Sequence, residues 1–163
     1  MTASAEQVVA ALGERGATVA TAESLTGGLL CAALVDVPGA SAVVRGGVVA
    51  YAPALKVGLL GVAASTIEAV GTVDPRTAHE MAVGVRERLG ADWGVSTTGV
   101  AGPGPAEGKP AGTVHVAVAG PDGVTAVELA LSGDRAAIRR GTVQAALSAL
   151  MGRLGEESPS TRR

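Results

Sequence analysis

A serine in a polar, glycine-rich turn is the first residue of the chain that could act as a nucleophile. The turn reads Thr21-Ala22-Glu23-Ser24-Leu25-Thr26-Gly27-Gly28 and is expected to join a short strand to a helix. A hydroxyl there would face solvent at the N-terminus of the helix, and the two glycines would let a ligand approach the backbone closely. Two interpretations stay open: Ser24 attacks a carbonyl carbon, or Ser24 or Thr26 only caps the helix. The Gly-x-Ser-x-Gly pattern of α/β-hydrolases is absent.

A phenol ends the next expected strand, and an amine follows it. Tyr51, the only tyrosine, ends the apolar run that starts at Gly46, and Lys56 lies about one turn into the helix expected after it. Both side chains could therefore project toward one cleft. Taken singly, Lys56 is interpreted as a solvated surface amine and Tyr51 as a core residue with a satisfied hydroxyl.

Neither histidine is placed to serve as a base for Ser24. His79 is expected on the exposed face of a helix, and His115 alternates with Val114 and Val116 on a strand. Neither has a neighbouring His, Cys or acid at metal-ligand spacing, so no metal site is expected. If Ser24 is a nucleophile, the available base is a lysine that is desolvated enough to be partly neutral near pH 7.

Two further segments could bind anions. The segment Thr98-Gly99-Val100-Ala101-Gly102-Pro103-Gly104-Pro105 follows an expected strand. Its backbone N–H groups could cradle an anion or form an oxyanion hole, and a flexible surface loop is the alternative. Arg135, at the start of the last expected helix, could hold a phosphate through two parallel hydrogen bonds, or could be a surface residue beside an ordinary helix cap. The glycine-rich phosphate loop of P-loop nucleotidases is absent.

Strands that alternate with helices must position these turns. Helices are expected at 5–15, 29–35, 54–60, 75–89 and about 134–154, and strands at 18–21, 46–51, 93–98, 113–119 and 124–131. Asp74 and Pro75 form a start signal for the fourth helix, and Gly90 forms a stop signal. The pattern predicts an α/β fold, a single layered domain whose mixed parallel and antiparallel sheet is flanked by helices. Ligands bind where the strands of such sheets end, which is where the turns described above lie.

Composition narrows the class of protein. The 163 residues suffice for one domain, expected at 1–154, followed by a charged and disordered tail at 155–163 that has little to bury. Aromatic residues make up 1% of the chain, so the core must be built from Ala, Val and Leu. A formal net charge of -2 and short basic runs argue against nucleic-acid and membrane partners. The single cysteine, Cys31, and the lack of a signal segment or a membrane-length apolar stretch predict a cytoplasmic protein.

Together these motifs resemble the C-terminal domain of the CinA family of competence-damage proteins. The resemblance runs from about Val8 to Leu150, and its motifs occur in the order of the family. They are Ala22-Glu23-Ser24-x-Thr26-Gly27-Gly28, Asp36-Val37-Pro38-Gly39, Gly46-Gly47-Val48-Val49-x-Tyr51, Lys56, Leu60-Gly61-Val62, Thr98-Gly99-Val100-Ala101-Gly102-Pro103, Lys109-Pro110 and Gly133-Asp134-Arg135.

The resemblance implies hydrolysis of nicotinamide mononucleotide to nicotinate mononucleotide and ammonia in bacterial pyridine-nucleotide salvage, without metal or organic cofactor. Ser24 would attack the carboxamide carbon, Lys56 would take its proton and later protonate the departing ammonia, and Tyr51 would orient the lysine or the serine. Arg135 would bind the 5′-phosphate. The other substrate-binding positions that the resemblance implies are Glu23, Thr26, Gly27, Gly28, Thr98, Gly99, Ala101 and Gly102.

Two departures from the family pattern leave an alternative function. Ala52-Pro53-Ala54 stands where the family usually has Ser-Asn-Glu, and Leu25 stands where Cys is common. The alternative is a catalytically weak or inactive nucleotide-binding or regulatory protein on the same scaffold. A third interpretation is an interaction module without a nucleotide site. Members of the family tend to form dimers or larger assemblies, so a homo-oligomer is expected.

Overall fold

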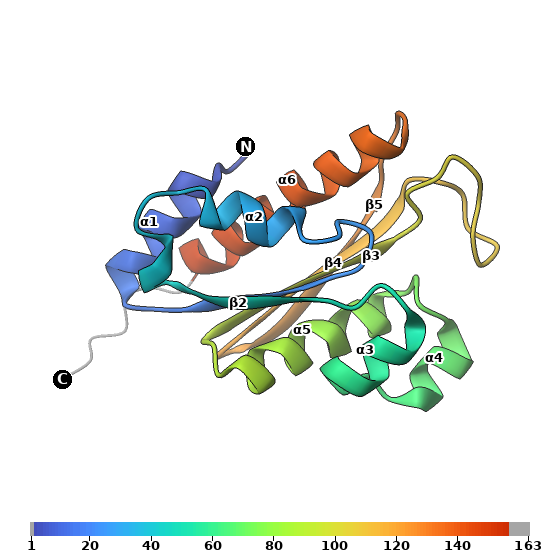
Figure 1. The fold of residues 1–163 in the computed structure, drawn as a ribbon, viewed down its shortest axis with the longest axis horizontal. Coiled ribbons are helices and arrows are strands. Elements are labelled where there is room, and N and C mark those ends of the chain that lie inside the picture. Colours follow the sequence, from blue (N-terminus) through green and yellow to red (C-terminus); the bar gives the residue numbers. More distant parts are fainter. Residues whose placement is uncertain (1, 157–163) are drawn as a thin grey trace.

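The computed structural model describes residues 2–156 and has a central sheet with helices on both sides (Figure 1). Its strands are β1 Val19–Glu23, β2 Val44–Val49, β3 Trp93–Gly99, β4 Thr113–Gly120 and β5 Gly123–Ala130. They lie in the order β2-β1-β3-β4-β5. The strands β2, β1 and β3 run parallel, whereas β4 is antiparallel to β3 and β5 is antiparallel to β4. The predicted α/β fold with a mixed sheet is confirmed.

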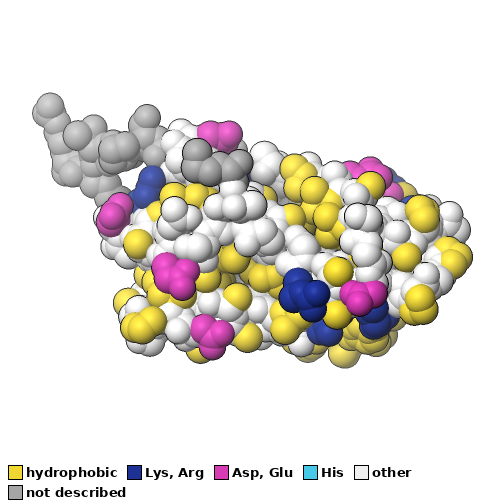
Figure 2. All heavy atoms as spheres, turned by 90° about the horizontal axis from the view of Figure 1, so that it is seen from above, with side chains coloured by type: hydrophobic (Ala, Val, Ile, Leu, Met, Phe, Trp, Pro, Cys, Tyr) yellow, Lys and Arg dark blue, Asp and Glu magenta, His cyan; other side chains and the backbone are white. Residues whose placement is uncertain are grey.

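Helices cover both faces of the sheet. On one side lie α1 Ala5–Arg15, α2 Leu29–Val35 and α6 Arg135–Glu156; on the other lie α3 Pro53–Leu60, α4 Ala64–Val70 and α5 Pro75–Leu89 (Figure 1). A short 3-10 helix at Ala40–Ala42 precedes β2. Within residues 2–156, no helix is both long and apolar enough to cross a membrane. On the face seen in Figure 2, acidic and basic side chains occur singly or in small groups.

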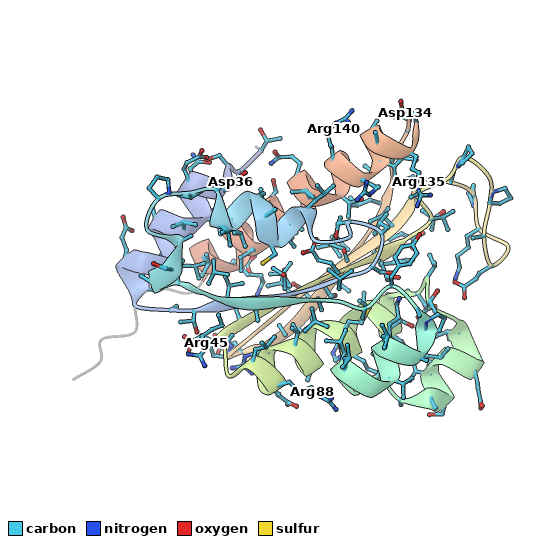
Figure 3. All side chains as sticks on the ribbon, in the orientation of Figure 1. Asp36, Arg45, Arg88, Asp134, Arg135 and Arg140 are labelled. Carbon is cyan, nitrogen blue, oxygen red and sulfur yellow. The ribbon has the colours of Figure 1, made fainter. Side chains whose placement is uncertain are left out.

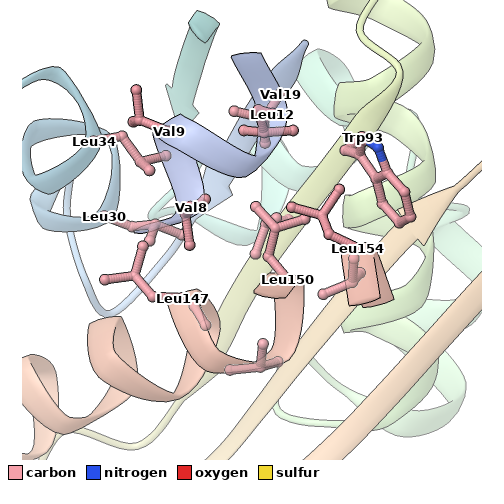
Figure 4. Close-up of a cluster of buried hydrophobic side chains, with 14 of the residues drawn as sticks. Val8, Val9, Leu12, Val19, Leu30, Leu34, Trp93, Leu147, Leu150 and Leu154 are labelled. Atoms are coloured by element: carbon pink, nitrogen blue, oxygen red, sulfur yellow. The ribbon is translucent and has the colours of Figure 1, made fainter. Parts of the chain in front are cut away.

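The main apolar core lies between the sheet and the layer of α1, α2 and α6 (Figure 4). Leu12 from α1, Leu30 from α2 and Leu150 from α6 are buried there. Trp93, at the start of β3, is buried in the same cluster. Leucine and valine side chains therefore make most of this core, as the scarcity of aromatic residues predicts.

The other face of the sheet holds α3, the helix that carries Lys56, against α5. A Cβ on Gly84 of α5 would lie 1.7 Å from the carbonyl oxygen of Leu60, the last residue of α3. Only a glycine permits so close an approach of the two backbones. Gly84 thus allows α5 to pack closely against the end of α3.

The structure confirms the helices predicted at 5–15, 29–35 and 75–89, the last with Asp74 and Gly90 as its caps. The strand predicted at 18–21 instead runs to Glu23 and so ends directly before Ser24. The sequence does not predict α4, because this helix has no side-chain cap and buries no residue. The predicted tail at 155–163 is wrong for residues 155–156, which belong to α6, and 157–163 lie outside the described residues.

Candidate active site

Three turns meet at the carboxyl ends of the parallel strands. In the register of the sheet, Glu23 at the end of β1 lies opposite Val49 of β2 and Thr97 of β3. The parallel pairing of the three strands therefore ends at one level, while β3 runs on to Gly99, and residues at and after these ends line one pocket of about 390 Å³. This pocket brings together eight of the residues that the sequence singles out, namely Ser24, Tyr51, Lys56, Thr98, Gly99, Ala101, Gly102 and Arg135.

The amine of Lys56 lies against the hydroxyl of Ser24. Its Nζ is 2.9 Å from Ser24 Oγ, and it also donates to the carbonyl oxygens of Ala50 at 2.8 Å and Tyr51 at 3.3 Å. Lys56 is 1% exposed and Ser24 is 8% exposed. Lys56 is therefore a buried side chain and not the solvated surface amine that its sequence position alone suggests.

Burial changes the acidity of this amine. It lowers the pKa of Lys56 from the ordinary value of 10.5 to about 8, although the carboxylate of Glu107 acts in the opposite direction. The neutral amine has two hydrogens for the two carbonyl oxygens and a lone pair that can accept the hydroxyl proton of Ser24. The ammonium form donates to all three oxygens. These contacts suit both protonation states through which a general base must pass.

The turn that carries Ser24 is held from two sides. The N–H of Ser24 donates to the carbonyl oxygen of Thr97 at 3.1 Å, which ties the turn to β3. From α6, Arg139 donates through Nε to the carbonyl oxygen of Leu25 at 2.8 Å and through Nη2 to that of Thr26 at 3.2 Å. No sequence motif points to Arg139. Its only signal is the spacing of two arginines by one helical turn at the start of α6.

Glu23 caps the helix that follows Ser24. Its Oε1 accepts the N–H of Leu30 at 2.8 Å and its Oε2 accepts the N–H of Cys31 at 3.0 Å. These N–H groups lie in the first turn of α2, and the residue before that helix, Gly28, has no side chain to bind them. The cap of α2 is therefore neither Ser24 nor Thr26, and the hydroxyl of Ser24 is left to Lys56.

Four of the positions that the resemblance assigns to substrate binding lie outside the pocket. Glu23 is 1% exposed and occupied by the helix start. The hydroxyl of Thr26 is fully buried and donates to Glu23 Oε1 at 2.6 Å. Gly27 and Gly28 supply the left-handed backbone of the turn, with φ values of 57° and 102°. All four residues build the turn and the start of α2.

Tyr51 and Arg135 form a link at the mouth of the pocket. Tyr51 is 61% exposed, so the interpretation as a core tyrosine is wrong. Its hydroxyl accepts from Nη2 of Arg135 at 3.2 Å, while Nη1 donates to the carbonyl oxygen of Gly102 at 2.7 Å. The backbone carbonyl of Tyr51, rather than its phenol, contacts Lys56. In Figure 3, Arg135 faces the loop that follows β3, whereas Arg140 points outward.

The loop between β3 and β4 is fastened to the turn before α5. The carboxylate of Glu107 accepts the N–H of Thr72 at 3.0 Å, the hydroxyl of Thr72 at 2.8 Å and the N–H of Val73 at 3.1 Å. The amine of Lys109 donates to the carbonyl oxygen of Val73. Glu107, Thr72 and Val73 all line the pocket. No sequence motif points to Glu107, because nothing in the glycine-proline segment marks one carboxylate as lining the pocket.

The two histidines take no part in the pocket. His79 is exposed on α5, as predicted, and His115 is buried in β4. In the part of the chain that the structure describes, no three His, Cys, Asp or Glu side chains group closely enough to hold a metal ion. The polar side chains that line the pocket are the hydroxyls, the amine of Lys56, the carboxylate of Glu107 and the guanidinium group of Arg135.

Known proteins of similar sequence share this domain. The family model of the CinA C-terminal domain matches residues 1–154. A CinA-like protein of Frankia casuarinae is 54% identical over 140 residues, which cover 86% of this chain and 32% of that protein. A CinA-like protein of an Anaeromyxobacter species is 52% identical over 144 residues, which cover 88% of this chain and 35% of that protein. The chain thus spans about one third of the length of these relatives.

Solved structures have the same fold. The crystal structure of a CinA superfamily protein from Klebsiella pneumoniae is 34% identical, with a TM-score of 0.91 over 94% of this chain and 96% of that chain. The structure of the competence/damage inducible protein CihA from Agrobacterium tumefaciens is 39% identical, with a TM-score of 0.89 over 93% of each chain. The chain therefore belongs to the CinA C-terminal domain family.

Proposed function

We propose that the chain is an amidohydrolase that converts nicotinamide mononucleotide to nicotinate mononucleotide and ammonia. The observation that carries this proposal is the 2.9 Å contact between Lys56 Nζ and Ser24 Oγ inside the pocket. A serine that touches a buried amine of lowered pKa is paired with a base, which is what nucleophilic attack on an amide needs. The family resemblance supports the choice of substrate.

The reaction proceeds in two halves. First, the neutral amine of Lys56 takes the hydroxyl proton of Ser24 while Oγ attacks the carboxamide carbon. The tetrahedral intermediate then expels ammonia, which takes its additional proton from the Lys56 ammonium. Next, Lys56 takes a proton from water, the hydroxide attacks the acyl-enzyme ester, and the acid is released as the proton returns to Ser24.

Backbone N–H groups of the pocket stabilise the charged oxygen of the intermediate. Leu25, Ala101 and Gly102 line the pocket together with Ser24, and we assign this role to their N–H groups. One such donor typically contributes about 3 kcal/mol of transition-state stabilisation.

Arg135 is the residue that we assign to the 5′-phosphate. It lines the pocket, and hydrogen bonds to Gly102 and Tyr51 use two of its N–H groups. A guanidinium group has five N–H donors, so the remaining N–H groups of Arg135 stay available for an anion. An Arg–phosphate contact is charge-assisted and directional, which suits a residue that must orient the substrate.

The test follows both products from purified variants. We expect wild type to release ammonia and nicotinate mononucleotide in equal amounts, and we expect Ser24→Ala and Lys56→Met to lose at least about 10³-fold in kcat/KM. Ser65→Ala, a serine exposed on α4, is the matched control and should stay active. A wild type that releases no product would contradict the proposal.

One observation favours a second function. Pro53, which lines the pocket, puts an apolar ring where the family usually has a polar side chain. Calorimetry that detects bound nicotinamide mononucleotide without turnover would support a nucleotide-binding protein on the same scaffold.

A further inference from the structure

Among the described residues, Glu107 is the only one that brings a carboxylate to the pocket wall, and the hydrolysis described above does not use it. Its oxygens are held in place by three hydrogen bonds. Oε1 accepts the N–H of Thr72 at 3.0 Å, and Oε2 accepts the hydroxyl of Thr72 at 2.8 Å and the N–H of Val73 at 3.1 Å. The φ of Glu107 is 52°, a left-handed conformation that is uncommon for a residue other than glycine. The loop thus presents one fixed carboxylate to the pocket.

This carboxylate is charged at neutral pH. Burial acts to raise the pKa of Glu107, but hydrogen bonds from Thr72 and Val73, together with the charge of Lys109, outweigh it and leave the pKa lowered. A carboxylate of lowered pKa is a poor base and carries no proton to donate. It makes no hydrogen bond to Ser24 or Lys56, and it acts on Lys56 through space. Glu107 can therefore act on a bound ligand only through its negative charge.

The pocket has two charged poles when Lys56 is neutral and ready to act as a base. The negative pole is Glu107 on the loop after β3, and the positive pole is Arg135 at the start of α6. Ser24 lies in the same pocket. A ligand that carries a cation on its amide-bearing ring and an anion on another group matches both poles.

We propose that Glu107 is a specificity-determining residue, whose carboxylate selects amides carried on a cationic ring over the same amides on a neutral ring. The inference rests on the proposed function, because the ring nitrogen of nicotinamide mononucleotide is alkylated and positively charged. Since the oxygens of Glu107 are directed at Thr72 and Val73, the carboxylate acts on the ring by charge and not by a hydrogen bond. Arg135 holds the anionic end of the same molecule.

The test compares two ligands that differ in ring charge. Nicotinamide mononucleotide and its 1,4-dihydro form share the carboxamide, ribose and phosphate, but only the first has a cationic ring. Calorimetry on the Ser24→Ala protein measures the dissociation constant of each ligand without turnover. The same measurement is then made with Glu107→Gln, Glu107→Asp and Thr72→Val added singly to Ser24→Ala. Thr72→Val removes one hydrogen bond to the carboxylate and keeps its charge.

We expect the Ser24→Ala protein to bind the cationic ligand more tightly, and Glu107→Gln to reduce this preference by up to about fivefold, as for an exposed charge pair. Glu107→Asp and Thr72→Val should keep most of the preference for the cationic ligand. If Glu107 had a purely structural role, Glu107→Gln and Thr72→Val would instead weaken the binding of both ligands equally. The inference is overturned if Glu107→Gln leaves the preference unchanged, or if the Ser24→Ala protein shows no preference for the cationic ligand. If the preference depends on Glu107 but wild type hydrolyses neither ligand, the inference stands and the proposed amidase fails.

Discussion

The buried amine of Lys56 makes activity depend on pH in a way that can be worked out. A pKa of about 8 leaves the amine about 1% neutral at pH 6, about 10% at pH 7 and about half neutral at pH 8. Because only the neutral amine can accept the proton of Ser24, kcat/KM should rise nearly tenfold between pH 6 and pH 7 and level off above about 8. Ammonia release at low substrate concentration measures this profile.

The same group makes stability depend on pH. The folded protein has the lower pKa, about 8 against the ordinary 10.5, so the unfolded chain binds more protons between these values. The free energy of unfolding therefore rises with pH across this window, and the full penalty of burying the charged amine is present below it. The gap between 10.5 and about 8 corresponds to about 3 kcal/mol.

Lys56→Met isolates this contribution. Urea unfolding measures the free energy of unfolding of wild type and of Lys56→Met at pH 7.5 and at pH 10. Subtracting the value of the variant from that of wild type at each pH cancels the contribution of the other titrating groups. Between pH 7.5 and pH 10 the free energy of unfolding of wild type should rise by about 2 kcal/mol relative to that of the variant, which is most of the roughly 3 kcal/mol expected for the full shift. Glu107→Gln provides a check of sign: because Glu107 raises the pKa of Lys56, its loss should move the activity profile to lower pH. A flat difference, or activity that levels off only near pH 10, would refute the assignment of Lys56 as a desolvated base.

Three further substitutions test the elements that support the site. Arg139→Met should lower kcat about tenfold or more with little change in KM, because the carbonyl oxygens of Leu25 and Thr26 lose the guanidinium group that holds them. The control is Arg140→Met, at an exposed position, and equal losses of kcat in both variants would argue against this role of Arg139. Glu23→Gln should destabilise the protein by about 2 kcal/mol in urea unfolding, because an amide cannot accept at both positions; an unchanged midpoint would contradict its role as the cap of α2. Gly84→Ala should cost more than about 3 kcal/mol, since its Cβ would lie 1.7 Å from the carbonyl oxygen of Leu60; a stable, active variant would show that α5 can move away from α3.

Local signals in the sequence predict where α5 begins and ends better than they predict how single side chains are oriented. Asp74 with Pro75 and Gly90 marks α5 because caps and stops depend on neighbouring residues. That the three turns lie together could also be predicted, because parallel strands have their carboxyl ends at the same edge of the sheet. The contacts of the Glu23 carboxylate with the start of α2 and of the Glu107 carboxylate with Thr72 and Val73 depend instead on the folded backbone, to which no local pattern refers.

Tyr51 shows the same limit from another side. A lone tyrosine after an apolar strand is expected to be buried, yet its phenol lies at the mouth of the pocket and binds Arg135, a residue 84 positions away. The useful part of Tyr51 for Lys56 is its backbone carbonyl, which every residue type has. Reasoning from side-chain chemistry therefore finds the correct position and assigns the contact to the wrong atom.

The position of Lys56 follows from how β2 ends beside β1. The N–H of Ala50 donates to the carbonyl oxygen of Glu23 at 2.9 Å, so Ala50 is tied to the residue immediately before Ser24. The carbonyl oxygen of Ala50 and the hydroxyl of Ser24 are thus fixed against the same stretch of backbone, and Lys56 Nζ reaches both at 2.8 Å and 2.9 Å. Burial of this amine lowers its pKa. A serine and a lysine 32 residues apart come into contact because one sheet register aligns their partners, which is why neither residue alone reveals the site.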